Sequence, residues 1–120
     1  MRSSKKEHGK ENLVEGELAS GSKVLVIEDL ISTGLSVKQN IGGIRGIGGQ
    51  VSTVIAITTS TRSAFDQTIA DLQVRLITLT NADITVQTAL EECIISSKQK
   101  ESIDAFFHDS KSWGKAMGFE

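Results

Sequence analysis

VLVIEDLISTGLS, residues 24–36, is the stretch that decides the fold of this chain. Its first four residues are apolar β-formers, which predicts a strand buried on both faces. Glu28 and Asp29 close that run, so both carboxylates are expected at the carboxyl edge of a sheet. Small hydroxyl residues around Gly34 follow, and there the backbone can turn sharply and aim successive N–H groups at one anion. Ser36, with a glutamine three residues later, predicts a helix that begins with a capping box.

Two carboxylates beside an anion-binding turn suit a ligand that carries both hydroxyls and a phosphate. Carboxylates accept charge-assisted hydrogen bonds from vicinal hydroxyls, and a loop with a helix N-terminus can hold the phosphate. A sugar phosphate has both groups. The same residues also fit a buried strand that ends in two solvated acids before an ordinary turn. A receiver-like domain is a further alternative, although it needs an acceptor aspartate where the middle strands end in Thr58-Thr59 and Thr80-Asn81.

The stretch resembles the phosphoribosyl pyrophosphate (PRPP) signature of type I phosphoribosyltransferases, in which four apolar residues and two acids precede small and hydroxyl residues around Thr-Gly. The resemblance implies that Glu28 and Asp29 bind the ribose 2- and 3-hydroxyls, with Asp29 also among the catalytic residues. It implies that the 5-phosphate loop is lined by Ser32, Thr33, Gly34 and Ser36.

RSSKKEHGKENLVEGEL, residues 2–18, resembles the catalytic loop of orotate phosphoribosyltransferases and the strand after it. Arg2, Lys6, His8 and Gly9 fall on matching positions. The resemblance implies that loop 1–10 is mobile, reaches across a homodimer interface and closes over the diphosphate of PRPP in the neighbouring site. It makes Arg2, Lys6 and His8 PRPP-binding residues, with Lys6 and His8 catalytic. Composition alone favours a basic, solvated terminus instead.

The implied reaction transfers the ribose 5-phosphate of PRPP to orotate, giving orotidine 5-monophosphate and diphosphate in de novo pyrimidine (UMP) biosynthesis. Displacing diphosphate builds positive charge on the ribose and negative charge on the leaving group, so fixed cations and Mg²⁺ would stabilise the transition state. We expect Mg²⁺ to bind mainly through PRPP, with no metal-binding residue assigned in the chain. Cys93 is the only cysteine, which excludes an internal disulfide.

The rest of the chain alternates strands and helices, which predicts a parallel sheet and an α/β fold class. The resemblance specifies a type I phosphoribosyltransferase (Rossmann-like) core that is N-terminally truncated. Strands are expected at about 12–17, 23–27, 51–59 and 74–79, and helices at about 36–47, 63–72 and 83–93, with a last helix after a capping box of Ser96 and Gln99. Residues 1–120 then form one partial domain, made of loop 1–10, a PRPP-binding core over 11–80 and C-terminal helices over 81–120.

Four side chains outside these motifs are interpreted as ordinary packing or surface residues. Cys93 falls in the apolar pattern of a predicted helix and is expected as a buried thiol. Arg62 follows a strand end, where some orotate enzymes carry a base-contacting arginine, but a surface arginine is the preferred interpretation. His108 and Trp113 are expected to pack or to face solvent, because no second metal-type residue is spaced with them.

Composition sets limits on the class of protein. The chain has 120 residues, of which 38% are hydrophobic and 23% charged, which is typical of one globular domain. A net charge of -2 argues against a general nucleic-acid binder, whose phosphate contacts need a positive excess. No apolar run approaches the ~20 residues that span a bilayer, and no signal peptide is recognised, so we expect a cytoplasmic protein.

The resemblance covers nearly all of this chain, whereas the chain covers only part of the family. We expect a C-terminal fragment, a truncated gene product or a separately encoded piece, without the region that would hold the base. That predicts an unpaired sheet edge and an uncovered apolar face, and hence self-association or pairing with another chain. Catalysis by this chain alone is doubtful, since nothing orients the base. The alternative is a non-catalytic PRPP- or nucleotide-sensing or assembly module of the same descent.

Overall fold

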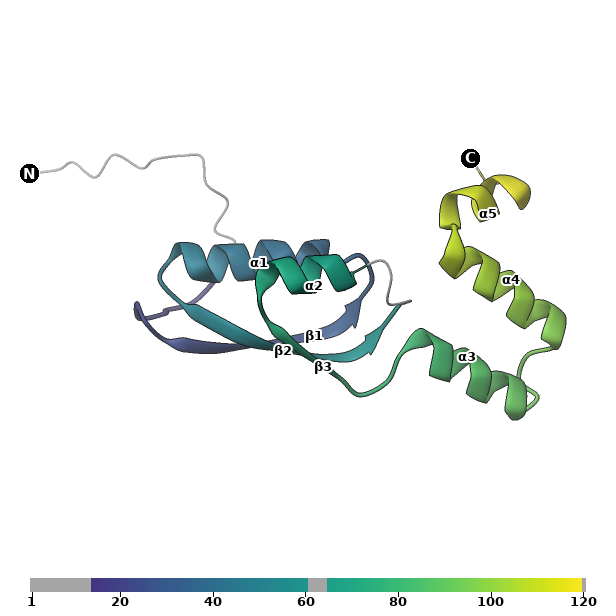
Figure 1. Ribbon diagram of the computed structural model, residues 1–120, viewed down its shortest axis with the longest axis horizontal. Coiled ribbons are helices and arrows are strands. Elements are labelled where there is room, and N and C mark those ends of the chain that lie inside the picture. The colour runs from purple at the N-terminus through teal and green to yellow at the C-terminus, as the bar shows by residue number, and fades with distance from the viewer. Residues whose placement is uncertain (1–13, 61–64, 120) are drawn as a thin grey trace, which may run out of the picture.

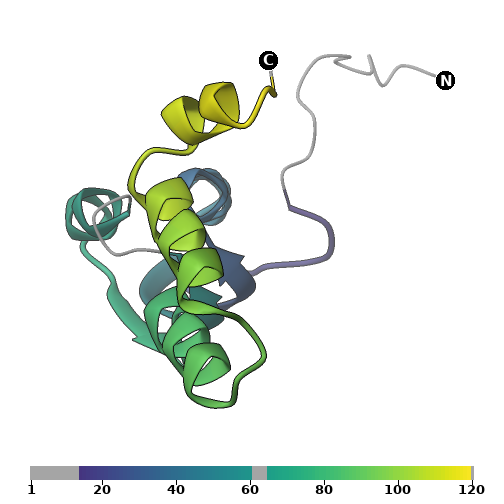
Figure 2. The same ribbon diagram turned by 90° about the vertical axis from the view of Figure 1, so that its right-hand side faces the viewer.

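The computed structural model describes residues 14–60 and 65–119, and a three-stranded parallel sheet lies at its centre (Figure 1). The strand order is β1-β2-β3, and two helices lie side by side on one face of the sheet. Three more helices follow β3 and lead away from the sheet, as both views show (Figures 1 and 2). The elements are β1 (Lys23–Ile31), α1 (Leu35–Gly46), β2 (Gln50–Thr59), α2 (Asp66–Leu72), β3 (Arg75–Thr78), α3 (Ala82–Glu91), α4 (Ser97–His108) and α5 (Ser110–Ala116). The predicted α/β class and parallel sheet are confirmed.

The hydrophobic core lies between the sheet and helices α1 and α2. Val26 of β1 is paired with Val54 of β2, which is paired in turn with Leu76 of β3, and this row faces the helices. Ile41 of α1 is fully buried against it. We call this side of the sheet the covered face. The buried residues are Val26, Ile31, Val37, Ile41, Val51, Val54, Ala56 and Phe65.

The opposite side of the sheet is apolar as well, but it is exposed in the described part of the chain. Ile27, Ile55 and Ile77 form a paired row one residue along from the covered row. Ile27 is 71% exposed and Ile77 36% exposed. We call this side the open face, made of Leu25, Ile27, Ile55, Ile57 and Ile77. The predicted burial of β1 on both faces is therefore wrong, whereas the expected uncovered apolar face is present.

Strand β1 is longer than its apolar run predicts. The acids were expected to close the strand at Ile27, but pairing with β2 continues through Leu30, opposite Thr58, to Ile31, opposite Thr59. The Ser60 N–H donates to the Ile31 carbonyl at 2.9 Å and extends the contact further. Main-chain hydrogen bonds do not depend on side-chain polarity, so Glu28 and Asp29 lie within the strand.

Helix α1 begins two residues earlier than the predicted capping box requires. Its N-cap is Gly34, with φ of 78° in the left-handed region, and no side chain caps it. Ser36 is therefore inside the helix and the predicted capping box is wrong. At the other end, Arg45 Nη2 donates to the carbonyls of Val51 and Leu72, each at 2.9 Å. This side chain ties α1 to the start of β2 and the end of α2.

The C-terminal helices are held by local contacts. The capping box predicted for α4 is confirmed: the Gln99 N–H donates to Ser96 Oγ, and the Ser96 N–H donates to Gln99 Oε1 at 2.8 Å. Trp113 of α5 packs edge-on against Phe106 of α4, with ring centroids 5.3 Å apart. Cys93 follows the end of α3 with φ of 57° and is exposed, so its predicted burial is wrong.

Two further expectations concern a strand near the N-terminus and helices that could cross a membrane. The strand expected at about 12–17 is absent over 14–17, and its first two residues lie outside the described part. Helices in the described ranges are too short or too polar to cross a membrane.

Candidate functional site

The loop of residues 32–36 joins the carboxyl end of β1 to the start of α1. Gly34 is buried and left-handed there, and a Cβ at this position would lie 3.1 Å from Cγ2 of Thr68 in α2. Residues other than glycine rarely adopt this backbone conformation, and their Cβ atom would also contact α2. The loop therefore depends on glycine at this position. The Lys38 N–H donates to the Gly34 carbonyl at 2.9 Å, which forms the first turn of α1 directly after the loop.

This loop surrounds a small hollow of about 110 Å³. The predicted 5-phosphate residues, Ser32, Thr33, Gly34 and Ser36, all line it. The Leu35 N–H lies 3.4 Å from Thr33 Oγ1, while Ser60 Oγ, at the end of β2, donates to the Ser32 carbonyl at 3.0 Å. The first residues of α1, Leu35 to Val37, also line the hollow, and a helix N-terminus is a favourable place for an anion. The structure thus brings together the four loop residues that the sequence singled out.

The two carboxylates lie within β1 and do not line the hollow of the loop. Glu28 accepts a hydrogen bond from Asn40 Nδ2 at 2.9 Å, on the side of α1. Asp29 is exposed, and its Oδ1 accepts the N–H of Leu30 at 2.7 Å. The prediction that acids and loop hold opposite ends of one ligand therefore requires these side chains to leave their present partners. Asn40 was missed by the sequence reasoning, although it lies one helical turn after Ser36.

The remaining predicted site residues cannot be placed. Arg2, Lys6, His8 and loop 1–10 lie outside the described residues, as do Arg62 and the first two residues of the helix expected at about 63–72. Their roles stay predictions. Among the described residues, no group of three or more His, Cys, Asp or Glu side chains could hold a metal ion.

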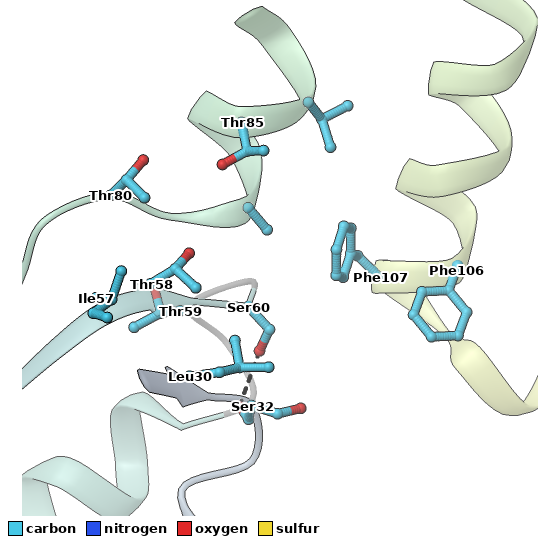
Figure 3. A pocket seen from close by; sticks show the side chains of 12 residues that line it. Leu30, Ser32, Ile57, Thr58, Thr59, Ser60, Thr80, Thr85, Phe106 and Phe107 are labelled. Atoms are coloured by element: carbon cyan, nitrogen blue, oxygen red, sulfur yellow. Dashed lines mark hydrogen bonds between the residues drawn. The ribbon is translucent and has the colours of Figure 1, made fainter. Parts of the chain in front are cut away.

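A larger cavity of about 540 Å³ lies at the carboxyl ends of the strands (Figure 3). Leu30, Ile57 and hydroxyl residues of the strand ends line one side, and Phe106 and Phe107 of α4 lie across from them. The sequence reasoning did not foresee this cavity. The signal was available in the hydroxyl residues at three consecutive strand ends, because ligands of parallel α/β sheets bind at those ends. At the strand ends the hydroxyl residues are Ser32, Thr58, Thr59, Ser60 and Thr80, and Thr85 of α3 also lines the cavity.

Comparison with known proteins gives relatives over most of the chain. No family model matches it. The chain is 41% identical over 114 residues to the orotate phosphoribosyltransferase of Porphyromonas gingivalis, a match that covers 95% of this chain and 54% of that protein. It is 36% identical over 115 residues to the orotate phosphoribosyltransferase of Listeria monocytogenes serotype 4b, with 96% and 55% covered. The chain thus spans about half the length of the curated relatives it matches.

The solved structure of orotate phosphoribosyltransferase from Aeropyrum pernix superimposes on this chain with a TM-score of 0.59 and 27% identity. That similarity covers 72% of this chain and 48% of the other. Sequence matches and a shared fold therefore point to the same group of proteins.

Proposed function

We propose that the chain binds PRPP and contributes to phosphoribosyl transfer, since it belongs to the orotate phosphoribosyltransferase family and spans about half the length of the curated relatives it matches. The reaction would convert PRPP and orotate to orotidine 5-monophosphate and diphosphate in pyrimidine biosynthesis. The observation that carries the proposal is the glycine-dependent 32–36 loop, whose hydroxyls and helix N-terminus converge on one small hollow.

In this proposal the 32–36 loop holds the 5-phosphate of PRPP. The hydroxyls of Ser32, Thr33 and Ser36 would donate to phosphate oxygens, together with the first N–H groups of α1. The hydrogen bond from Ser60 to the Ser32 carbonyl supports the loop from β2 and limits how far it can move. A preformed loop lowers the entropy lost on binding.

Glu28 and Asp29 would bind the ribose hydroxyls at the side of the same loop. Glu28 would exchange its hydrogen bond with Asn40 for one from a ribose hydroxyl, which gives a charge-assisted bond of similar length. Asp29 is already exposed and would accept the second hydroxyl. Asp29 would also stabilise the positive charge that develops on the ribose.

Mg²⁺ would bind mainly through oxygen atoms of PRPP. This suits the described residues, because magnesium is commonly held by one or two carboxylates together with substrate phosphates and water. When bound, the ion would neutralise charge that develops on the departing diphosphate. Glu28 and Asp29 are the carboxylates of the chain that would face the ion or its bound water.

The basic loop 1–10 would complete the site from a second copy of the chain, in a cytoplasmic homodimer. Arg2 and Lys6 would neutralise the diphosphate, and His8 would supply a proton or a hydrogen bond to it. Closure of such a loop would exclude water during the transfer.

Isothermal titration with PRPP and Mg²⁺ tests the proposal. We expect heat of binding for the wild-type chain and its loss for the Glu28→Ala/Asp29→Ala variant. The matched control is Glu91→Ala/Glu92→Ala, which removes another adjacent pair of exposed acids at the end of α3. Absence of heat for the wild type would refute PRPP binding at this site. So would a Glu28→Ala/Asp29→Ala variant that gives the same heat as the wild type.

A non-catalytic sensing or assembly module is the second candidate function, and the coverage of only about half of each relative favours it. In that case the chain would bind PRPP without forming orotidine 5-monophosphate. Product formation from PRPP and orotate, followed by chromatography, separates the two functions. Product that appears with the wild-type chain and disappears with Asp29→Ala favours the enzyme.

A further inference from the structure

The two acids of β1 differ in the element that holds each side chain. Asp29 is exposed, and its Oδ1 accepts a local hydrogen bond from the N–H of Leu30 at 2.7 Å. Glu28 is half-buried and is bonded to a different element, because Asn40 Nδ2 of α1 donates to its Oε1 at 2.9 Å. Adjacent residues of a strand point to opposite faces of the sheet. One carboxylate is therefore held by a helix and the other by its own strand.

The bond to Asn40 keeps the Glu28 carboxylate apart from the 32–36 loop. Because β1 and β2 are parallel, α1 runs back from the loop, and Asn40 lies four residues, or about 6 Å of helix, after Ser36. Glu28 and Asn40 both line a hollow of about 290 Å³ beside β1. None of the residues that line it also lines the 110 Å³ hollow of the loop. The carboxylate thus lies in a different hollow from the one proposed for the 5-phosphate.

This arrangement separates a negative charge from an anion site. A carboxylate that turned toward the loop would repel an anion there, and the repulsion is stronger near a protein surface than in bulk water. The hydrogen bond from Asn40 holds that charge beside α1 before a ligand binds. A ligand hydroxyl close to Glu28 is a competing donor, since an ionised carboxylate accepts hydrogen bonds from hydroxyls and amides alike.

We propose that Asn40 is a positioning residue that sets how strongly the site prefers a sugar phosphate to a phosphate without hydroxyls. The inference rests on the proposed function, in which Glu28 exchanges its bond with Asn40 for one with a ribose hydroxyl. A sugar phosphate then breaks the bond between Asn40 and Glu28, whereas a simple phosphate leaves it intact. The gain in affinity from the ribose hydroxyl is reduced by the strength of the broken bond.

Binding of two phosphate monoesters tests this role. Ethyl phosphate carries no hydroxyl, whereas ribose 5-phosphate carries the hydroxyls assigned to Glu28 and Asp29, and both titrations are followed by the NMR shift of the Gly34 amide. In Asn40→Ala the dissociation constant of ribose 5-phosphate should fall about three- to tenfold, because no bond with Asn40 is broken. That of ethyl phosphate should not fall. Gln39→Ala changes the adjacent exposed residue of α1 and should alter neither constant.

The ratio of the two dissociation constants separates this role from a structural one, because a loosened loop would weaken the binding of both esters together. In a Glu28→Ala background the same change at Asn40 should leave the ratio unaltered. A ratio that stays the same or moves in the opposite direction in Asn40→Ala would overturn the inference and leave PRPP binding intact. So would a ratio that changes equally without Glu28. Failure of the wild-type chain to bind ribose 5-phosphate would overturn the proposed function as well.

Discussion

Two neighbouring rows of the same sheet differ in what they contribute to the fold. Val26, Val54 and Leu76 face α1 and α2, and Val54 is completely buried. Ile27, Ile55 and Ile77 lie one residue further along each strand, and Ile27 is 71% exposed. Both rows are equally apolar. The difference teaches that hydrophobicity identifies the strands, whereas the elements packed on each face decide which residues stabilise them.

The C-terminal helices extend this contrast. None of the described residues of α3, α4 or α5 is buried, although Ile84 and Phe106 are large and apolar. These helices are stabilised by caps, by pairs one turn apart and by the contact of Trp113 with Phe106. The layer of β1–β3 with α1 and α2 is stabilised by burial. We therefore expect the two parts to respond differently to substitution.

The largest expected effect is on the covered face. Ile41→Ala removes a fully buried side chain and should lower the free energy of unfolding by about 3 to 4 kcal/mol, through lost apolar burial and the cavity left behind. Ile27→Ala is the same chemical change on the open face and should cost less than about 1 kcal/mol. Urea denaturation followed by circular dichroism measures both. Similar losses in the two variants would contradict the assignment of the faces.

A smaller effect is expected where the 32–36 loop meets α2. Gly34→Ala places a Cβ 3.1 Å from Thr68 Cγ2 and forces alanine into the left-handed region, so the cost should be about 2 kcal/mol. Gly21→Ala is the matched control, since Gly21 has a similar φ of 83° but nothing within 4 Å of the added Cβ. The excess cost at position 34 measures the contact with α2. Equal costs would show that the contact relaxes freely.

The sequence predicted the strands and the local caps more fully than the features that depend on contacts between distant residues. Strands β2 and β3 and the capping box of Ser96 follow from apolar runs and local spacing, which are properties of neighbouring residues. The extension of β1 past Glu28 depends on pairing with β2, and the exposure of Ile27 depends on what packs beneath it. Neither is encoded locally. The same reason explains why the neighbouring residues of the 32–36 loop were singled out while Asn40, the partner of Glu28, was not.

Loss of the α4 cap should destabilise the C-terminal helices and leave the stability of the sheet unchanged. Ser96→Ala removes the acceptor of the Gln99 N–H and should destabilise α4 by about 1 kcal/mol. Trp113 is the only tryptophan and packs on Phe106 of α4, so its fluorescence reports on these helices. The urea midpoint of the fluorescence should fall, while amide exchange in β2 stays unchanged. Ser97→Ala, one position later, is the control. A parallel loss of β2 protection would mean that both parts unfold as one unit.

The smallest expected effect concerns the exposed ion pair between Lys100 and Asp104, one turn apart on α4. Lys100→Met keeps most of the apolar stem and removes the charge, which should cost less than about 0.5 kcal/mol. The basic residue precedes the acidic one, which is the weaker order for such pairs in a helix. The Trp113 fluorescence midpoint, measured at low and high salt, should differ from wild type only at low salt. A difference that persists in high salt would assign the loss to packing of the lysine stem. Part of α4 would then be stabilised by apolar burial, as the covered face is.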